Sequence, residues 1–189
     1  MKYSDIYRLY STSQPKDAIH QALREVPVDD SDEQYEDRSP LHLACQYGDT
    51  EGVKILLERD AEPNTKDANG STPIHILGRT SAGCADEDKL KEIAVMLIEQ
   101  GANIPRSAKN TTALIECVRN RHFKMAEAII DSGARVNSTD LNGENVLFGF
   151  CAASGDIRRD IRFAKKELDE SVQYRYPENK ICLLYTSPS

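Results

Sequence analysis

The stretch Asp67-Ala68-Asn69-Gly70-Ser71-Thr72-Pro73-Ile74-His75 decides the fold of this chain. Asn69 and Gly70 tolerate positive φ, so they predict a tight polar turn. Thr72 is a good helix N-cap, and Pro73 suits the first helical position, where a backbone N–H is not needed. The stretch therefore predicts a turn that leads directly into a helix.

A related stretch, Arg38-Ser39-Pro40-Leu41-His42, lies upstream. Ser39 precedes Thr72 by 33 residues, and Thr112 precedes Asn145 by the same distance. A period of about 33 residues is typical of one class of stacked helix-turn-helix repeat. The spacing therefore predicts a repeat protein in which each unit packs on its neighbours.

Two closing motifs recur in phase with these helix starts, Gly101-Ala102-Asn103-Ile104 and Gly133-Ala134-Arg135-Val136-Asn137. Together the motifs resemble the ankyrin-repeat family over roughly residues 38–155. The resemblance implies an all-α ankyrin-repeat solenoid of about four stacked helix-turn-helix units with short β-hairpin-like loops. It also implies that the histidine at each helix start, with the preceding Ser or Thr, ties neighbouring hairpins together by hydrogen bonds.

Some units depart from the family pattern. Thr112-Ala113-Leu114-Ile115 lacks the proline and the histidine, and Asn145-Val146-Leu147-Phe148 lacks them too. Asp60 stands where the closing glycine of the first unit is expected. These departures weaken individual units and leave the predicted fold class unchanged.

The predicted organisation follows from the phasing of these motifs. We expect irregular capping helices and an acidic loop over 1–37, repeat 1 over 38–66, repeat 2 over 67–106, repeat 3 over 107–139, a degenerate repeat 4 over 140–170 and a tail over 171–189. Residues 182–189 resemble sequencing-adaptor read-through, so we expect the natural chain to continue past about Ile181.

Repeat 2 carries about eight extra residues within 79–88, between its two predicted helices. Insertions of this kind often map to a binding face, although a neutral surface loop is the slightly favoured interpretation. Cys84 lies in the insertion and is the thiol expected to be accessible. A redox or regulatory role for Cys84 stays open.

Bulk properties restrict the functional class. The net charge of −7 over 189 residues disfavours nucleic-acid binding, which needs a basic surface. No window holds 18 consecutive apolar residues, so no membrane span is expected. The first ten residues lack the apolar core of a signal peptide. We therefore expect a soluble, cytoplasmic monomer, with secretion by a route that lacks a cleaved signal left open.

The sequence contains no pattern expected of a catalytic, cofactor-binding or metal site. His42, Cys45 and His75 could align along a stack, but no paired-cysteine motif accompanies them, so structural roles are expected. Cys45, Cys117 and Cys151 fall at helix positions that favour a small apolar side chain. We therefore predict a non-enzyme without cofactors.

The expected binding surface comprises hairpin-tip residues and exposed inner-helix residues on the concave face of the solenoid. The candidate partner-binding residues are Tyr35, Glu36, Arg38, Gln46, Tyr47, Asn69, Ser71, Arg79, Thr80, Lys109, Arg119, Asn120, Leu141, Asn142 and Glu144. Tyr and Arg most often dominate interface energies, so Tyr35, Tyr47, Arg79 and Arg119 are the strongest candidates.

The leading functional hypothesis is a module that binds another protein, as a scaffold, adaptor or inhibitor. An alternative hypothesis is the targeting or substrate-recognition region of a longer enzyme. A third hypothesis is a binder regulated through the Cys84 thiol.

Overall fold

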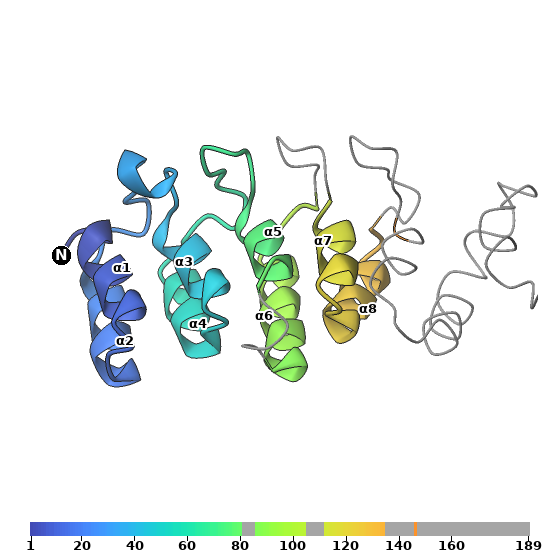
Figure 1. The fold of residues 1–189 in the computed structure, drawn as a ribbon, viewed down its shortest axis with the longest axis horizontal. Coiled ribbons are helices and arrows are strands. Elements are labelled where there is room, and N and C mark those ends of the chain that lie inside the picture. Colours follow the sequence, from blue (N-terminus) through green and yellow to red (C-terminus); the bar gives the residue numbers. More distant parts are fainter. Residues whose placement is uncertain (81–85, 105–111, 135–145, 147–189) are drawn as a thin grey trace, which may run out of the picture. The chain divides into compact units, whose positions relative to one another are not determined.

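A computed structural model describes residues 1–80, 86–104, 112–134 and 146 of the chain (Figure 1). The chain divides into two compact units, Met1–Ala153 and Ser154–Ser189, and every described residue lies in the first. The regular elements of the described residues are helices. They are α1 (Tyr3–Ser11), α2 (Lys16–Glu25), the 3-10 helix η1 (Glu33–Tyr35), α3 (Pro40–Gln46), α4 (Thr50–Glu58), α5 (Pro73–Gly78), α6 (Glu87–Glu99), α7 (Ala113–Arg119) and α8 (Phe123–Asp131).

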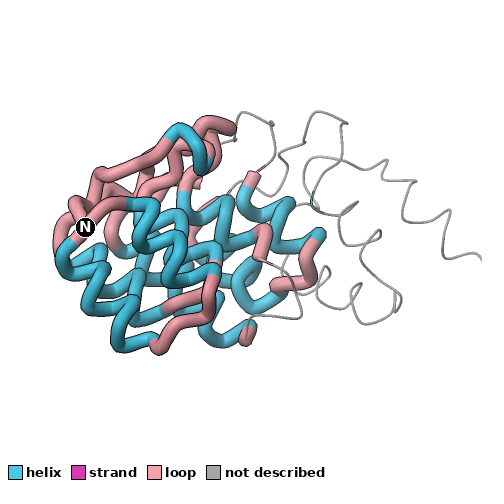
Figure 2. The backbone as a smooth tube through the Cα atoms, turned by 60° about the vertical axis from the view of Figure 1, so that its left-hand side comes forward, coloured by secondary structure: helices cyan, strands magenta, loops and turns pink. Residues whose placement is uncertain are grey.

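The eight α-helices of the described residues pack as four pairs, α1/α2, α3/α4, α5/α6 and α7/α8 (Figure 1). The inner helices α1, α3, α5 and α7 contact one another in order, and the outer helices α2, α4, α6 and α8 form a second row (Figure 2). Each pair therefore covers the apolar face of the next. This arrangement confirms the predicted all-α solenoid.

The helix starts follow from the sequence motifs. Pro40 opens α3 after Ser39, and Pro73 opens α5 after Thr72, as the N-cap pattern predicts. Leu56 of α4 is fully buried, and each of the other α-helices also contributes fully buried apolar side chains. The core is thus a thin apolar layer that continues from pair to pair.

The Asp67 stretch forms the predicted turn. One carboxylate oxygen of Asp67, Oδ1, accepts hydrogen bonds from the backbone N–H of Asn69 at 2.9 Å and of Ser71 at 2.8 Å. Gly70 adopts a φ of 66°, whereas Asn69 keeps a negative φ. The turn therefore uses the conformational freedom of the glycine alone. The N–H of Ala68 donates to Glu36 O at 2.8 Å and links two successive hairpins.

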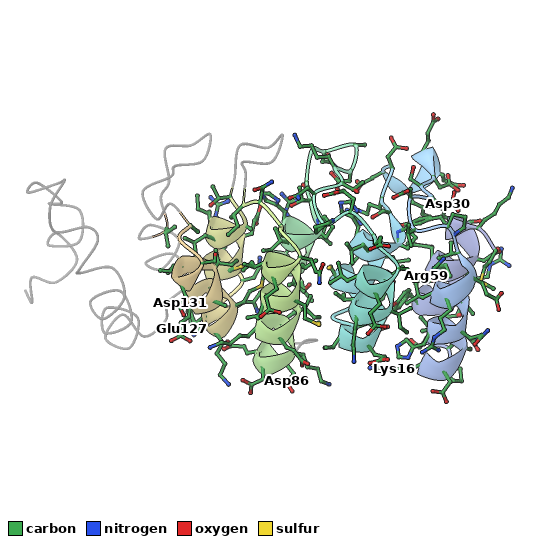
Figure 3. All side chains as sticks on the ribbon, turned by 180° about the vertical axis from the view of Figure 1, so that it is seen from behind. Lys16, Asp30, Arg59, Asp86, Glu127 and Asp131 are labelled. Carbon is green, nitrogen blue, oxygen red and sulfur yellow. The ribbon has the colours of Figure 1, made fainter. Side chains whose placement is uncertain are left out.

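The N-terminal pair joins the stack as a packed unit, with α1 against α3 and α2 against α4. Arg59 strengthens this joint because its Nη1 atom donates to the backbone oxygens of Leu23 and Val26 (Figure 3). Tyr3 and Ile6 are buried on the inward face of α1, whereas Leu9 is half-buried.

The unit-closing positions share a left-handed backbone. Gly101 has a φ of 85° and Gly133 a φ of 87°, the region that glycine adopts without steric cost. Asp60 takes a φ of 61° at the corresponding position of the first unit. The turn geometry is therefore the same without the glycine, but Asp60 adopts a left-handed backbone conformation that is unfavourable for residues with a side chain.

Candidate functional site

The hairpins are tied together by a buried histidine. His42 Nδ1 accepts from the Ser39 N–H at 3.2 Å, so Nε2 carries the proton and donates to Ser71 O at 3.0 Å. Burial lowers the pKa of His42, which keeps the imidazole neutral in this role. His75 repeats the local part of the arrangement, with Nδ1 at 3.3 Å from the Thr72 N. The tie implied by the resemblance is confirmed for His42.

A second tie joins each hairpin to the end of its inner helix. Arg38 Nη1 donates to Gln46 Oε1 at 2.9 Å, and Arg79 Nη1 donates to Ser71 Oγ at 3.0 Å. Gln46 and Arg79 occupy equivalent positions, six residues after Pro40 and Pro73. Both repeats therefore have a hydrogen bond between these two positions. In the first the donor is Arg38 of the hairpin, and in the second the donor is Arg79 at the end of the helix.

Polar contacts also join the end of α5 and the residues that follow it to α7 and the residues between α7 and α8. Arg79 Nε lies 3.0 Å from Glu116 Oε1, and the Asn120 amide donates to Gly78 O at 3.0 Å. His122 Nε2 lies 2.6 Å from Thr80 O. These bonds fix the side chains that border the inner helices before any partner binds.

The structure places the predicted site residues unequally. Ser71 is fully buried because its backbone bonds to Asp67 and His42 and its hydroxyl accepts from Arg79. The expectation that Ser71 projects from a hairpin tip was therefore wrong, and its side chain is not presented to a partner. Predicted residues outside the described part of the chain are Lys109, Leu141, Asn142 and Glu144, as well as Cys84 and Cys151.

The remaining predicted residues are exposed or half-buried, and we call them the candidate surface. They are Tyr35, Glu36, Arg38, Gln46, Tyr47, Asn69, Arg79, Thr80, Arg119 and Asn120. Tyr47 has 42% of its surface exposed and is one of three exposed large hydrophobic residues among those described. Aromatic side chains are enriched at protein–protein interfaces relative to the rest of the surface.

Tyr35 and Tyr47 are supported by aromatic residues of α1 that were not predicted from the sequence. The Tyr7 and Tyr35 rings lie 4.3 Å apart, and the Tyr10 and Tyr47 rings stack at 4.8 Å. Helical spacing places Tyr3, Tyr7 and Tyr10 along one side of α1, which was the available signal. Their contacts with Tyr35 and Tyr47 appear only once the helices are packed.

The outer helices present a different surface. Lys91 Nζ of α6 lies 3.2 Å from Glu127 Oε2 of α8, and Lys124 Nζ lies 2.6 Å from Asp88 Oδ1. Figure 3 shows charged side chains along these helices, with Glu127 and Asp131 labelled on α8. Mixed, paired charges of this kind suit a solvated face, so the outer helices are the weaker candidate for binding.

Within the described ranges, no three His, Cys, Asp or Glu side chains are grouped to hold a metal ion. Cys45 and Cys117 are fully buried, and burial raises the pKa of both thiols, which disfavours the reactive thiolate. Among the described helices, none combines the length and apolar composition that a membrane crossing requires.

Comparison with known proteins identifies the repeats. The sequence pattern of the family described as ankyrin repeats (many copies) matches residues 22–77. The chain is 38% identical over 69 residues to a transient receptor potential cation channel subfamily A member 1 homolog of Caenorhabditis elegans, covering 36% of this chain and 6% of that protein. It is 30% identical over 144 residues to neurogenic locus notch homolog protein 1 of Mus musculus, covering 76% of this chain and 5% of that protein.

A third relative is the ankyrin repeat protein nuc-2 of Neurospora crassa, 29% identical over 124 residues. That match covers 65% of this chain and 10% of the relative. The chain therefore spans a tenth or less of the length of each of these three relatives.

Proposed function

Because the chain belongs to the ankyrin-repeat family, whose repeats generally serve as protein-interaction modules, we propose that it binds a partner protein through the candidate surface. The exposed ring of Tyr47 at the joint between α1 and α3 carries this proposal. The stacked ring of the buried Tyr10 holds it in place, so little conformational entropy would be lost on binding.

The charged residues of the candidate surface support the same function. Arg79 is fixed by Glu116 and Arg38 by Gln46, so both guanidinium groups are oriented in advance. Arg and Tyr side chains are enriched among residues that dominate binding energy. The proposed role is stoichiometric binding, as a scaffold, adaptor or inhibitor, and the family is typically non-enzymatic.

The proposed repeat boundaries remain 38–66, 67–106 and 107–139, with an N-terminal unit over 1–37. On these boundaries the candidate surface draws on all three repeats and on the loop that precedes the first. A partner that contacts the whole surface would therefore bridge several units. Binding and the stability of the stack would then be coupled, because a partner that binds only the folded form stabilises it.

Affinity capture followed by mass spectrometry tests the proposal. The 189-residue chain would be compared with a variant in which the four strongest candidates are changed, Tyr35→Ala, Tyr47→Ala, Arg79→Ala and Arg119→Ala. A matched control would change four exposed residues of the outer helices, Glu51→Ala, Glu92→Ala, Val95→Ala and Glu99→Ala. Circular dichroism would confirm that every variant is folded.

Each captured protein would then be purified, and its Kd measured by calorimetry. The proposal expects a partner whose binding is lost with the first variant and kept with the control. If removal of the arginines unfolds the chain, the double change Tyr35→Ala and Tyr47→Ala serves in its place. Equal binding by all variants would exclude the candidate surface.

A further inference from the structure

The five tyrosines of the described residues form two sets of ring contacts, one of Tyr3, Tyr35 and Tyr7 and the other of Tyr47 and Tyr10, and we call these five residues together the tyrosine ladder. The Tyr3 and Tyr35 ring centres lie 5.7 Å apart, those of Tyr7 and Tyr35 4.3 Å, and those of Tyr10 and Tyr47 4.8 Å. Three tyrosines come from α1, one from η1 and one from the end of α3.

The tyrosines of the ladder differ in how far they are exposed to solvent. Tyr3 and Tyr10 are buried, whereas Tyr7 and Tyr35 are half-buried and Tyr47 is exposed. Partial burial, and then the neighbouring Tyr7, raise the pKa of Tyr47, so its hydroxyl stays neutral near pH 7. Tyr7, Tyr35 and Tyr47 therefore present their aromatic rings to a partner. The faces of such rings carry negative potential.

The segment that carries Tyr35 is strongly acidic. No basic residue lies between Arg24 and Arg38, and this interval contains seven Asp and Glu side chains. No ion pair among the described residues engages Asp29, Glu33 or Asp37. We call residues 29–37 the acidic turn. The acidic turn therefore adds negative charge beside Tyr35.

Arg38 is the cation nearest to this turn in sequence, and its charge is already matched. It pairs with Glu36 through Nη2 at 2.5 Å, and its Nε lies 3.7 Å from Asp67 Oδ2. Nη1 of the same side chain is bonded to Gln46. Arg38 therefore does not neutralise the rest of the acidic turn.

A buried hydroxyl supplies an independent observation. Tyr3 is 1% exposed, and its hydroxyl has no hydrogen-bond partner among the described residues. Groups close enough to influence its pKa include Arg38, Asp32 and the hydroxyls of Tyr7 and Tyr35. The hydroxyl thus lies near other tyrosines of the ladder and near Asp32 of the acidic turn.

We propose that the tyrosine ladder and the acidic turn bind an arginine or lysine side chain from a basic segment of the partner protein. The proposal rests on the proposed function, because it names the chemistry of the partner at the N-terminal end of the candidate surface. Cations are attracted to the face of an aromatic ring. Neighbouring carboxylates then guide a basic segment to that face through charge complementarity.

A pair of synthetic peptides tests this proposal on the 189-residue chain. The first is a fluorescein-labelled peptide of alternating arginine and glycine, and the second replaces every arginine with citrulline, which keeps the shape and removes the charge. Fluorescence anisotropy at low and at physiological salt gives Kd for both. We expect the citrulline peptide to bind at least tenfold more weakly.

Variants of the chain locate the site. Tyr47→Ala should weaken binding of the arginine peptide about tenfold, whereas Tyr47→Phe keeps the ring and should stay within about twofold. The double change Glu33→Gln and Asp37→Asn should weaken binding about fivefold and reduce its salt dependence. Glu92→Gln with Glu99→Gln removes the same charge from the outer face and serves as the control.

Three results would overturn the proposal. They are equal affinity for the citrulline peptide, unchanged affinity of Tyr47→Ala, and an equal loss with the outer-face control. A different result would overturn the proposed function, namely that no captured partner depends on the candidate surface. A partner that depends on Arg79 and Arg119 but carries no basic segment would overturn this inference and leave the proposed function standing.

Discussion

The Tyr10 hydroxyl donates a hydrogen bond to Asp49 Oδ2 at 2.7 Å and joins the first helix to the residue that precedes α4. His20 Nε2, from α2, lies 3.0 and 3.1 Å from the two oxygens of the same carboxylate. Asp49 is 5% exposed. One buried carboxylate is thus held by side chains of both helices of the N-terminal pair.

Tyr10→Phe should therefore destabilise the chain. The change leaves the ring in place and removes one hydrogen bond to a buried charged group, which should cost about 2 kcal/mol of unfolding free energy. Urea denaturation measures this loss. Tyr47→Phe is the control, because the Tyr47 ring is exposed, and we expect a change within about 0.5 kcal/mol. Equal stability of the two variants would contradict a structural role for the Tyr10 hydroxyl.

The apolar layer predicts a large effect at Leu56. This side chain is fully buried in α4, so Leu56→Ala should cost about 2–5 kcal/mol through lost burial and the cavity left behind. Val95→Ala, on an exposed position of α6, should stay within about 0.5 kcal/mol. Thermal and urea unfolding would measure both variants. A loss well under 1 kcal/mol for Leu56→Ala would contradict the assigned core.

The fold was predictable because its determinants are local and periodic. Thr72 and Pro73 start a helix through neighbouring backbone groups alone, and the same motif recurs at Ser39. Ser71 shows where such reasoning fails. Its position in a polar turn suggests exposure, but the bond from His42 comes from the neighbouring repeat, which sequence order does not reveal.

The tyrosine ladder was predictable only in part. Spacing alone places Tyr3, Tyr7 and Tyr10 on one side of α1. Tyr35 lies 28 residues after its ring partner Tyr7, and Tyr47 lies 37 residues after Tyr10, so these contacts arise through the packing of separate elements. Nothing in their immediate surroundings in the sequence indicates this contact. Long-range aromatic contacts of this kind depend on the stack as a whole.

The neutral state of His42 predicts a dependence of stability on pH. Burial lowers the pKa of His42 in the folded protein, whereas the unfolded chain binds a proton near pH 6.5. The unfolded state therefore binds more protons as the pH falls. The His42 contribution is fully present above about pH 6.5 and is lost as the pH falls toward the lowered folded-state pKa.

The measurement compares the native chain with His42→Gln by urea unfolding between about pH 7.5 and pH 5. At the upper pH the variant should be less stable by about 1 kcal/mol, the typical value of one lost hydrogen bond. The difference between the two chains should shrink as the pH falls. A constant difference across the range would show that His42 does not carry this proton linkage.

Substitutions at the positions that close the first two units should change stability in opposite directions. Asp60 has a φ of 61°, so Asp60→Gly should relieve about 0.5–1 kcal/mol of backbone strain. Gly101 has a φ of 85° with no atom within 4 Å of an added Cβ, so Gly101→Ala should cost about 1 kcal/mol through the backbone alone. Midpoints of urea unfolding measure both changes. Shifts of the same sign would contradict this assignment.

Replacement of Gly52 by alanine should have two opposing effects on the free energy of unfolding. Within a helix, Gly→Ala normally stabilises by up to about 1 kcal/mol. Here an added Cβ would lie 2.6 Å from Asp49 Oδ2 and 2.9 Å from the Tyr10 hydroxyl oxygen. Both groups are fixed by their mutual bond, so overpacking should cost about 1–3 kcal/mol and outweigh the helix preference.

Gly52→Ala should therefore destabilise the native chain, and the loss should be smaller in a Tyr10→Phe background. The phenyl ring lacks the oxygen that the Cβ would meet, and the Asp49 carboxylate then loses one of the two side chains that hold it. Contacting residues commonly show coupling energies of about 0.5–3 kcal/mol in such a double-mutant cycle. Urea unfolding of the four chains gives the coupling. Additive losses, or a more stable Gly52→Ala chain, would show that the bond from Tyr10 to Asp49 does not determine the packing at this joint.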